Sequence, residues 1–90
     1  MTMLEISVTA EFERMILLLP PPIQKKLKKQ ERMIRSDIFH PSLRTEKLEP
    51  RGKELWSFRI DRSYRVVFRF VSGKHIRLLA IGPHSWIYRF

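Results

Sequence analysis

Arginines lie on both sides of a short turn in the segment LWSFRIDRSYRVVFRF, and a histidine and a tyrosine follow near the C-terminus. Arg59 and Arg65 are the residues nearest the turn whose guanidinium groups could face each other, and His84 precedes Tyr88 by four positions. Guanidinium groups bind phosphate oxygens through paired hydrogen bonds, and histidine is the usual side chain for proton transfer near neutral pH. These residue types therefore favour chemistry on a phosphate ester.

Together with Glu46, these side chains suit metal-free cleavage of RNA. A base removes the proton of a 2′-hydroxyl, the oxygen attacks its own phosphate, and an acid protonates the departing 5′-oxygen. Arginines would stabilise the charge of the phosphorane. Other chemistries are disfavoured, because His40, His75 and His84 lack metal-ligand spacing and there is no phosphate-binding glycine loop or nucleophile motif. We expect no metal and no cofactor.

The net charge of the 90-residue chain is +9, from 18 basic and 9 acidic side chains. The basic excess lies in residues 23–90, because residues 1–22 hold three acids and one base. Such a surface favours a polyanion, either nucleic acid or an acidic protein. Solubility alone is the competing explanation.

The length predicts a single domain over residues 1–90. Cysteine is absent, which excludes a disulfide framework and a thiolate metal site. The longest apolar stretch, MILLLPPP, is too short to span a bilayer and ends in prolines. We therefore expect a cytoplasmic protein without membrane contact.

Apolar periodicity predicts an α+β fold. The alternation in MLEISVTA indicates a first strand, and Thr9 can cap a helix that ends at the three prolines of residues 20–22. A second helix is expected over residues 22–36, with a lysine-rich face that is either solvated or meets an acidic partner. Residues 37–54 have the composition of a loop, and three strands follow. The expected fold has the N-terminal strand and the helical hairpin packed on one face of a small antiparallel sheet.

A three-residue turn at residues 61–63 fixes the predicted register of the first hairpin. Phe58 then faces Val66 on an apolar core face, and Arg59 faces Arg65 on the other face. Like charges opposite each other cost roughly 0.2–1 kcal/mol, which a bound phosphate would offset. Ion pairing of the two arginines with loop acids is the alternative explanation.

A second three-residue turn, at residues 72–74, is predicted for the next hairpin. Phe68 then faces Leu78, and Val66 faces Ala80, on the core face. The outward face is expected to carry Arg59, Arg65, Val67, Leu79 and Ile81, with Arg69 opposite Arg77 further along. In the closing motif IGPHSWIYRF, a sharp turn at Gly82-Pro83 is expected to place His84 at the sheet end near Arg65.

Three segments give the chain a resemblance to the RelE/ParE toxin superfamily of bacterial type II toxin–antitoxin systems: HPSLRTEKL, LWSFRIDRSYRVVFRF and IGPHSWIY. The order of strand, helical hairpin and meander extends the resemblance over nearly the whole chain, and LP…IQKKLKK matches at the helix junction. The resemblance implies a RelE-like microbial RNase-type fold and an acidic antitoxin that wraps the toxin. Members similar to RelE, YoeB and YafQ cut mRNA in the ribosomal A site, whereas members similar to ParE poison DNA gyrase.

The resemblance also implies roles for individual residues. Arg65 matches the arginine that contacts the scissile phosphate, and Arg59 falls where RelE has a lysine. His84 falls where YafQ-like and YoeB-like members have a catalytic histidine. Tyr88 matches the closing aromatic residue, and Glu46 matches the glutamate base of YoeB-like toxins.

Further RNA contacts are expected from Arg69, Arg77, Lys47 and Ser57. Ser57 stands where RelE has a second lysine, so a lysine-driven mechanism is not expected. Because arginine does not deprotonate in proteins, Arg59 and Arg65 are assigned to phosphate stabilisation and His84 to proton transfer.

The sequence thus predicts a toxin that acts as a ribosome-dependent mRNA endonuclease and inhibits translation. Its expected partners are a cognate acidic antitoxin and mRNA on the ribosome, with ribosomal RNA contacted through the basic face. Two alternatives stay open: a ParE-like, non-catalytic inhibitor of DNA gyrase, and a nucleic-acid-binding module without toxicity.

Overall fold

The computed structural model describes residues 3–48 and 54–87 of the chain. An N-terminal strand leads into two helices, α1 (Ala10–Leu17) and α2 (Pro21–Ser36). The side chain of Thr9 accepts a hydrogen bond from the backbone N–H of Phe12 at 3.0 Å, which is the predicted helix cap. Proline at the first positions of α2 supplies a backbone angle suited to a helix start, so the expected helical hairpin is confirmed.

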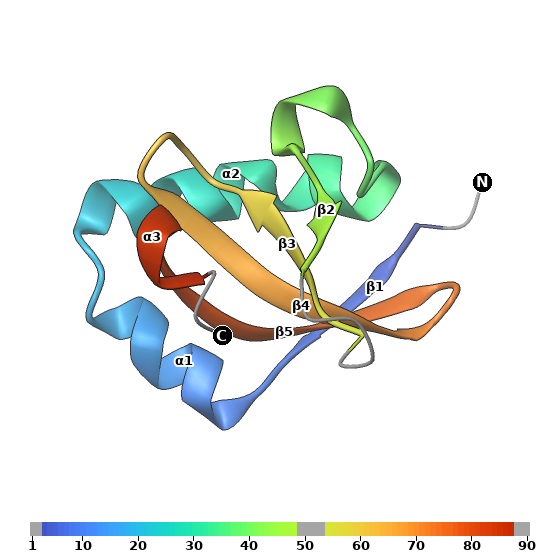
Figure 1. Ribbon diagram of the computed structural model, residues 1–90, viewed down its shortest axis with the longest axis horizontal. Coiled ribbons are helices and arrows are strands. Elements are labelled where there is room, and N and C mark those ends of the chain that lie inside the picture. Colours follow the sequence, from blue (N-terminus) through green and yellow to red (C-terminus); the bar gives the residue numbers. More distant parts are fainter. Residues whose placement is uncertain (1–2, 49–53, 88–90) are drawn as a thin grey trace.

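A five-stranded sheet forms the centre of the molecule, in the order β1-β5-β4-β3-β2 (Figure 1). The strands are β1 (Glu5–Val8), β2 (Glu46–Lys47), β3 (Trp56–Arg59), β4 (Tyr64–Ser72) and β5 (His75–Pro83). The α+β class is confirmed. In detail, the N-terminal strand does not lie on a sheet face: β1 pairs with β5 in parallel, which makes the sheet mixed.

The segment predicted as a loop contains two short elements. A 3₁₀ turn, η1 (Pro41–Leu43), is followed by β2, which pairs with β3. Leu43 and Leu48 are buried, as expected of anchors that hold this segment on the domain.

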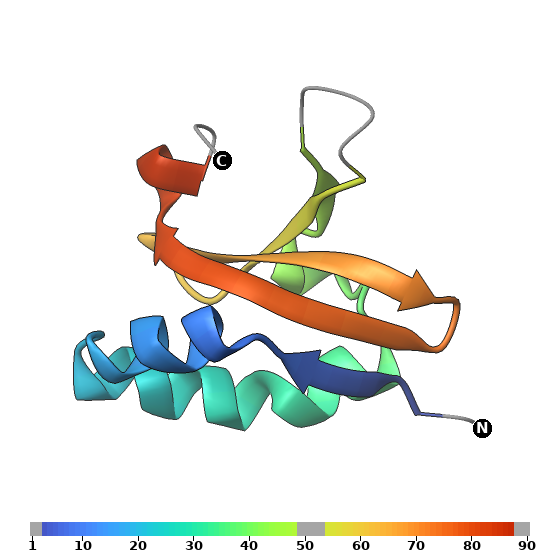
Figure 2. The same ribbon diagram turned by 90° about the horizontal axis from the view of Figure 1, so that it is seen from below.

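The two sheet faces are covered by different elements (Figure 2). Helices α1 and α2 lie on one face, where Phe12, Leu27 and Ile34 join the main core with residues of the sheet, including Phe58 and Phe68. The short helix α3 (His84–Ile87) lies on the other face. This second face carries the arginine of the candidate site.

The register of the first hairpin is as predicted: Phe58 pairs with Val66 and Arg59 pairs with Arg65. The second hairpin begins as predicted, with Phe68 opposite Leu78, but the register shifts between Val67 and Phe68.

This shift leaves Leu79 as an extra residue on β5 and corrects two predictions. Val66 pairs with Ile81 instead of Ala80. The bulge turns Ile81 into the main core and Ala80 to the second face. Burying the larger of the two side chains among the core residues favours this arrangement.

A second irregularity lies near the β4–β5 turn. Ser72 pairs with His75, so the turn has two residues instead of three. The register also shifts between Phe70 and Ser72, which leaves Val71 extra and keeps Phe70 opposite Ile76. Phe70 therefore pairs with Ile76 as predicted, although the turn is one residue shorter than expected and Val71 is extra.

The second face is not open at its centre, contrary to expectation. Val67 and Ala80 are buried there beneath Leu48, with Leu55 and Trp86 packed against them. The segment before β3 and the helix α3 thus cover the middle of the face where an exposed apolar strip was expected.

Candidate functional site

Arg65 is the most constrained of the predicted site residues. It lies on β4 and is only 5% exposed. Its Nε donates a hydrogen bond to Ser57 Oγ at 3.1 Å, and its Nη2 donates to the backbone carbonyl of Arg44 at 2.7 Å. Glu46 Oε1 lies 3.8 Å from the same Nη2. Residues of β2, β3 and the turn after η1 therefore fix this guanidinium.

The Arg44 carbonyl was not anticipated from the sequence. Arg44 follows η1 with φ of 49°, a left-handed conformation that few non-glycine residues adopt. The turn before it is held by the buried Leu43 and by His40, whose Nδ1 accepts from the Ser42 N–H at 3.1 Å. Strained backbone of this kind persists only where surrounding contacts enforce it. No local pattern signals this role, because a carbonyl is present on every residue.

Part of the Arg65 guanidinium remains available. Its Nη1 makes no hydrogen bond within residues 3–48 and 54–87. This nitrogen is therefore accessible, because Gln30 Oε1 is the only side-chain nitrogen or oxygen of those residues that is buried without a partner. A fixed cation with N–H donors accessible to a ligand suits a phosphate oxygen, because little side-chain entropy remains to be lost on binding.

His84 begins α3, next to the turn between β3 and β4. Its backbone N–H donates to the carbonyl of Ser63 at 2.7 Å, and its side chain is exposed. The expected sharp turn at Gly82-Pro83 is wrong, because β5 continues through Pro83, and Gly82 pairs with Arg65. Gly82, the neighbour of Arg65 on β5, therefore precedes His84 by two residues. His84 and Arg65 thus lie at the same end of the sheet, as expected.

Glycine at position 82 allows α3 to fold back on the sheet. A Cβ at this position would lie 2.5 Å from Cε3 of Trp86. The indole ring thus packs directly on the Gly82 backbone, and the second-face cluster holds it there. This contact positions the histidine at the start of the same helix.

Two other predicted residues, Glu46 and Ser57, lie beside Arg65. Glu46 pairs with Ser57 across β2 and β3, and its side chain is 46% exposed. Lys47 pairs with Trp56, which packs against the main core, so its side chain lies on the opposite face of the sheet from Arg65. Its Nζ is 3.3 Å from Glu54 Oε2 and 6.0 Å from the centre of the Trp56 ring. The expected RNA contact of Ser57 needs correction, because Ser57 has no exposed surface and its hydroxyl instead holds Arg65.

Arg59 is half-buried and pairs with Arg65 across the ladder. It lines a polar cavity together with residues of α2, whereas Arg65 is held by the β2 side of the sheet. The two arginines are strand neighbours, but their protein contacts differ. Tyr88 lies outside the described residues.

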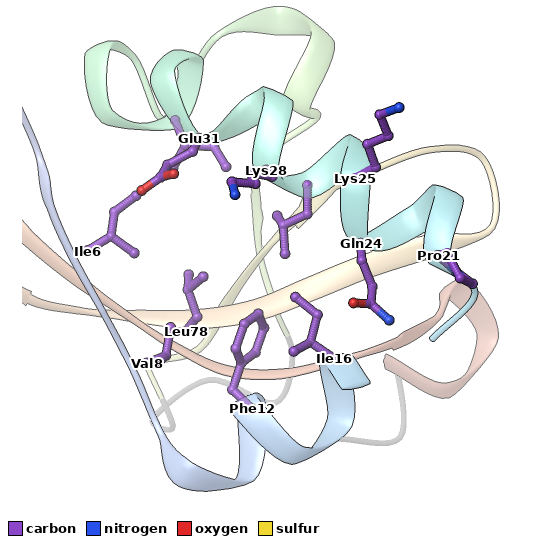
Figure 3. A pocket seen from close by; sticks show the side chains of 12 residues that line it. Ile6, Val8, Phe12, Ile16, Pro21, Gln24, Lys25, Lys28, Glu31 and Leu78 are labelled. Carbon is purple, nitrogen blue, oxygen red and sulfur yellow. The ribbon is translucent and has the colours of Figure 1, made fainter. Parts of the chain in front are cut away.

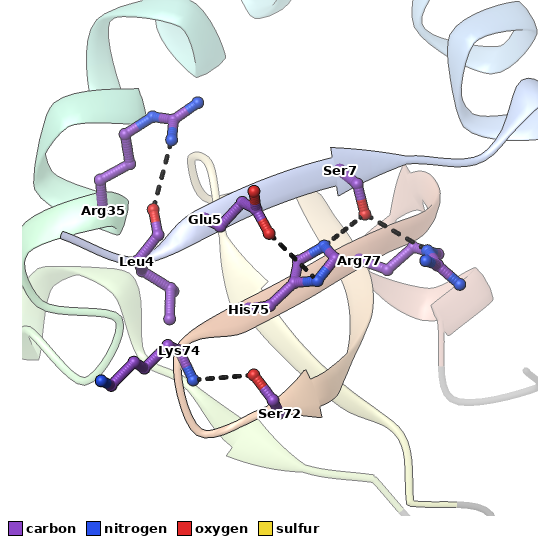
Figure 4. A network of polar contacts seen from close by, with 8 residues as sticks. All are labelled: Leu4, Glu5, Ser7, Arg35, Ser72, Lys74, His75 and Arg77. Atoms are coloured by element: carbon purple, nitrogen blue, oxygen red, sulfur yellow. Dashed lines mark hydrogen bonds and ion pairs between the residues drawn. The ribbon is translucent and has the colours of Figure 1, made fainter. Parts of the chain in front are cut away.

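Arg69 and Arg77 are exposed and opposite each other, as predicted. Arg77 also contacts a polar network on β1 and β5 (Figure 4). Its Nε donates to Ser7 Oγ at 3.3 Å, while His75 places Nε2 2.8 Å from that oxygen and Nδ1 3.4 Å from Glu5 Oε2. This network could not be predicted from the sequence, because only the parallel pairing of β1 with β5 brings the residues together.

An apolar cavity of about 600 Å³ lies on the helical side of the sheet (Figure 3). Phe12, Ile16 and Leu78 line it, with Lys25 and Lys28 of α2 also among its lining residues. None of the predicted site residues belongs to it. Within the described ranges, no three histidine, aspartate or glutamate side chains gather as a metal site, and no helix is long and apolar enough to cross a membrane.

No protein-family model matches the chain, and no curated protein sequence matches it. Solved structures do. A YoeB/ParE toxin from Agrobacterium tumefaciens has a TM-score of 0.71 at 19% identity, covering 90% of this chain and 99% of the toxin. YafQ from Escherichia coli has a TM-score of 0.73 at 12% identity, covering 94% and 98% of the two chains.

The archaeal RelE–RelB complex from Pyrococcus horikoshii gives a TM-score of 0.73 at 19% identity, with 94% of this chain and 98% of the matched chain covered. At such identities the likeness is one of fold. The N-terminal strand, the helical hairpin and the three-stranded meander of this chain thus form the fold of the RelE, YoeB and YafQ toxins.

Proposed function

We propose that this protein is the toxin of a type II toxin–antitoxin system, and that it is a metal-independent endoribonuclease. It would cut mRNA on the ribosome and so stop translation in the cytoplasm, and a cognate acidic antitoxin would neutralise it. The toxins that share its fold include structures solved as toxin–antitoxin complexes. The observation that carries the proposal is the guanidinium of Arg65, which is fixed by Ser57 and Arg44 and retains an accessible Nη1.

In the proposed reaction, Arg65 holds the scissile phosphate and Arg59 adds charge from the neighbouring strand. The 2′-oxygen forms a bond to phosphorus as the bond from phosphorus to the 5′-oxygen breaks. The products are a 2′,3′-cyclic phosphate and a 5′-hydroxyl, and no co-reactant is needed. The arginines stabilise the dianionic phosphorane, because their charge is already in position when it forms.

Proton transfer is assigned to His84, with Glu46 as the second titratable group at the site. The exposed imidazole of His84 and the half-exposed carboxylate of Glu46 are both accessible to an RNA strand. Lys47, Arg69 and Arg77 are proposed to contact the RNA backbone beyond the scissile phosphate. Tyr88 is proposed as the closing aromatic residue of the site.

Inhibition of DNA gyrase is the second candidate, because one structure of the same fold is described as a YoeB/ParE toxin. Expression of the chain without an antitoxin separates the two, with protein synthesis, mRNA integrity and plasmid supercoiling measured in parallel. We expect translation to stop within minutes with cut mRNA and unchanged supercoiling. Loss of supercoiling with intact mRNA would instead establish the gyrase function.

The same experiment includes His84→Ala, with Ser85→Ala as a control at the adjacent exposed position. His84→Ala should abolish mRNA cleavage, because it removes the proton-transfer group but keeps the backbone N–H that bonds Ser63. Ser85→Ala should remain toxic. Unchanged killing by His84→Ala would remove this residue from the mechanism.

A further inference from the structure

A polar cavity of about 680 Å³ lies between α2, η1 and the turn that joins β3 to β4. Its lining residues are Lys26, Gln30, Ser42, Arg59, Ile60, Asp61 and Arg62. Figure 1 shows the β3–β4 turn over the α2 ribbon, in agreement with this lining. The cavity is separate from the apolar one between α1 and α2, with which it shares no residue.

Three cations from different elements converge on this cavity. Lys26 comes from α2, Arg59 from β3 and Arg62 from the turn. Within the described part of the chain, none of the three has an ion pair. The one acid in the lining, Asp61, uses its Oδ1 to accept from the N–H groups of Ser63 and Tyr64, each at 2.8 Å. Among the described residues, the lining therefore carries three cations against one carboxylate, a formal excess of two positive charges.

One residue of the lining, Gln30, also has an acceptor that lacks a partner. The Nε2 of Gln30 donates to the carbonyl of Ile60 at 3.0 Å, which fixes the side-chain amide. Its Oε1 is buried without a hydrogen-bond partner among the described residues. A buried acceptor left unsatisfied is unfavourable, so a ligand that reaches it with a hydroxyl donor gains a hydrogen bond at a low cost in desolvation.

The β3–β4 turn connects this cavity to the candidate site. Asp61 and Arg62 line the cavity, and the next residue, Ser63, accepts the backbone hydrogen bond of His84. On the strand, Arg59 lines the cavity and pairs with Arg65. A chain of phosphates that reaches Arg65 therefore has a second group of cations close to its path.

We propose that this cavity binds a backbone phosphodiester of the same RNA that enters the candidate site, and that Gln30 accepts a hydrogen bond from the adjoining 2′-hydroxyl. Lys26 and Arg62 hold the phosphate, and Arg59, which also lines the cavity, keeps its role at the scissile phosphate. The hydroxyl distinguishes RNA from DNA, since deoxyribose lacks it. This inference rests on the proposed function, because it takes RNA as the substrate.

The test is binding of a fluorescently labelled RNA 12-mer and of DNA of the same sequence, measured by anisotropy over a series of salt concentrations. All proteins carry His84→Ala to prevent cleavage. A double variant, Lys26→Gln with Arg62→Gln, is compared with a control double variant, Lys29→Gln with Arg32→Gln. Both remove two positive charges, but Lys29 and Arg32 are exposed on α2 and do not line the cavity. Thermal unfolding checks that each variant is folded.

We expect the cavity pair to weaken RNA binding at least tenfold at about 0.1 M salt, and to reduce the salt dependence of log K by about 0.7, the value for one phosphate of a single strand. The control pair should stay within about twofold of the parent, since its cations contact no phosphate. Gln30→Leu should weaken RNA binding and leave DNA binding unchanged.

Equal binding by the two charge pairs would overturn the cavity proposal and leave the nuclease proposal standing. RNA that binds in the cavity but is never cut by the wild-type chain, on or off the ribosome, would overturn only the nuclease. A chain that binds no RNA 12-mer would overturn the cavity proposal, while the expression experiment tests the nuclease separately. If the cavity pair instead loses binding of a labelled poly-glutamate peptide and keeps RNA, the cavity is a protein-binding site and the proposal is wrong.

Discussion

At the residue scale, the candidate site depends on one guanidinium whose position is fixed before any ligand arrives. Arg65 contacts Ser57 Oγ and the Arg44 carbonyl through different nitrogens, and Glu46 is 3.8 Å from one of them. A planar guanidinium has several N–H donors and can bond these two groups and a phosphate at the same time, whereas the compact ammonium of a lysine cannot. This arrangement explains how an arginine can be nearly buried on β4, a strand of mostly apolar residues.

Arg65→Lys tests this role, because it keeps the charge and removes the fork. We expect at least a tenfold loss of RNA cleavage and a loss of about 1–3 kcal/mol in the free energy of unfolding, since the buried Ser57 hydroxyl loses its partner. Cleavage rates and urea denaturation measure the two effects. Wild-type cleavage by this variant would show that charge alone suffices at this position.

At the element scale, the site requires α3 to lie on the second face of the sheet. The helix is four residues long, too short to be stable by itself, so its position depends on packing. Trp86 provides that packing through Gly82 and the buried cluster of Leu48, Val67 and Ala80. The position of His84 therefore depends on the packing of the Trp86 ring against Gly82 of β5, because both residues belong to α3.

Gly82→Ala should disturb this link. The new Cβ would come within 3 Å of two carbons of the Trp86 ring, so the ring and α3 must shift away from β5. We expect mRNA cleavage to fall at least tenfold while ribosome or RNA binding, which is assigned to the strand cations in the proposed function, changes little. Gly73→Ala is the matched control, because a Cβ there meets no atom within 4 Å. Equal activity of the two variants would contradict the positioning role of Trp86.

At the scale of the whole molecule, the arginine-bearing sheet is supported by one core on its helical side. Phe68 is fully buried, with its ring centre 5.7 Å from that of Phe58 and 5.4 Å from that of Phe70. A domain of this size typically has only about 5–15 kcal/mol of stability, so a single core residue accounts for a large share of it.

Phe68→Ala should therefore lower the free energy of unfolding by about 3–5 kcal/mol, as a large aromatic side chain is replaced by a cavity. Leu18→Ala, at a position 86% exposed, should change it by less than about 0.5 kcal/mol. Urea denaturation measures both. A loss below about 1 kcal/mol for Phe68→Ala would show that this core can repack around the missing ring.

Much of the fold could be predicted because its signals are local. The cap at Thr9, the prolines before α2 and the alternation around the β3–β4 turn each lie within a few residues of the structure that they determine. The backbone pairing of Arg59 with Arg65 follows from the same turn. The different contacts of the two side chains, Arg59 lining the cavity beside α2 and Arg65 bonding the Arg44 carbonyl, did not follow from it. The bulge at Leu79 could not be found this way, because the choice between Ala80 and Ile81 for the core depends on what packs above and below the strand.

The amino-acid sequence by itself determined the two long helices, the four longer strands, the register of the first hairpin and the excess of basic charge, since periodicity, turn chemistry and composition act over short distances along the chain. Only the tertiary structure determined the parallel pairing of β1 with β5, the hydrogen bond from Arg65 to the Arg44 carbonyl and the cavity between α2, η1 and the β3–β4 turn. Each of these brings together residues far apart in sequence, and such contacts form only when the core has fixed the elements in space.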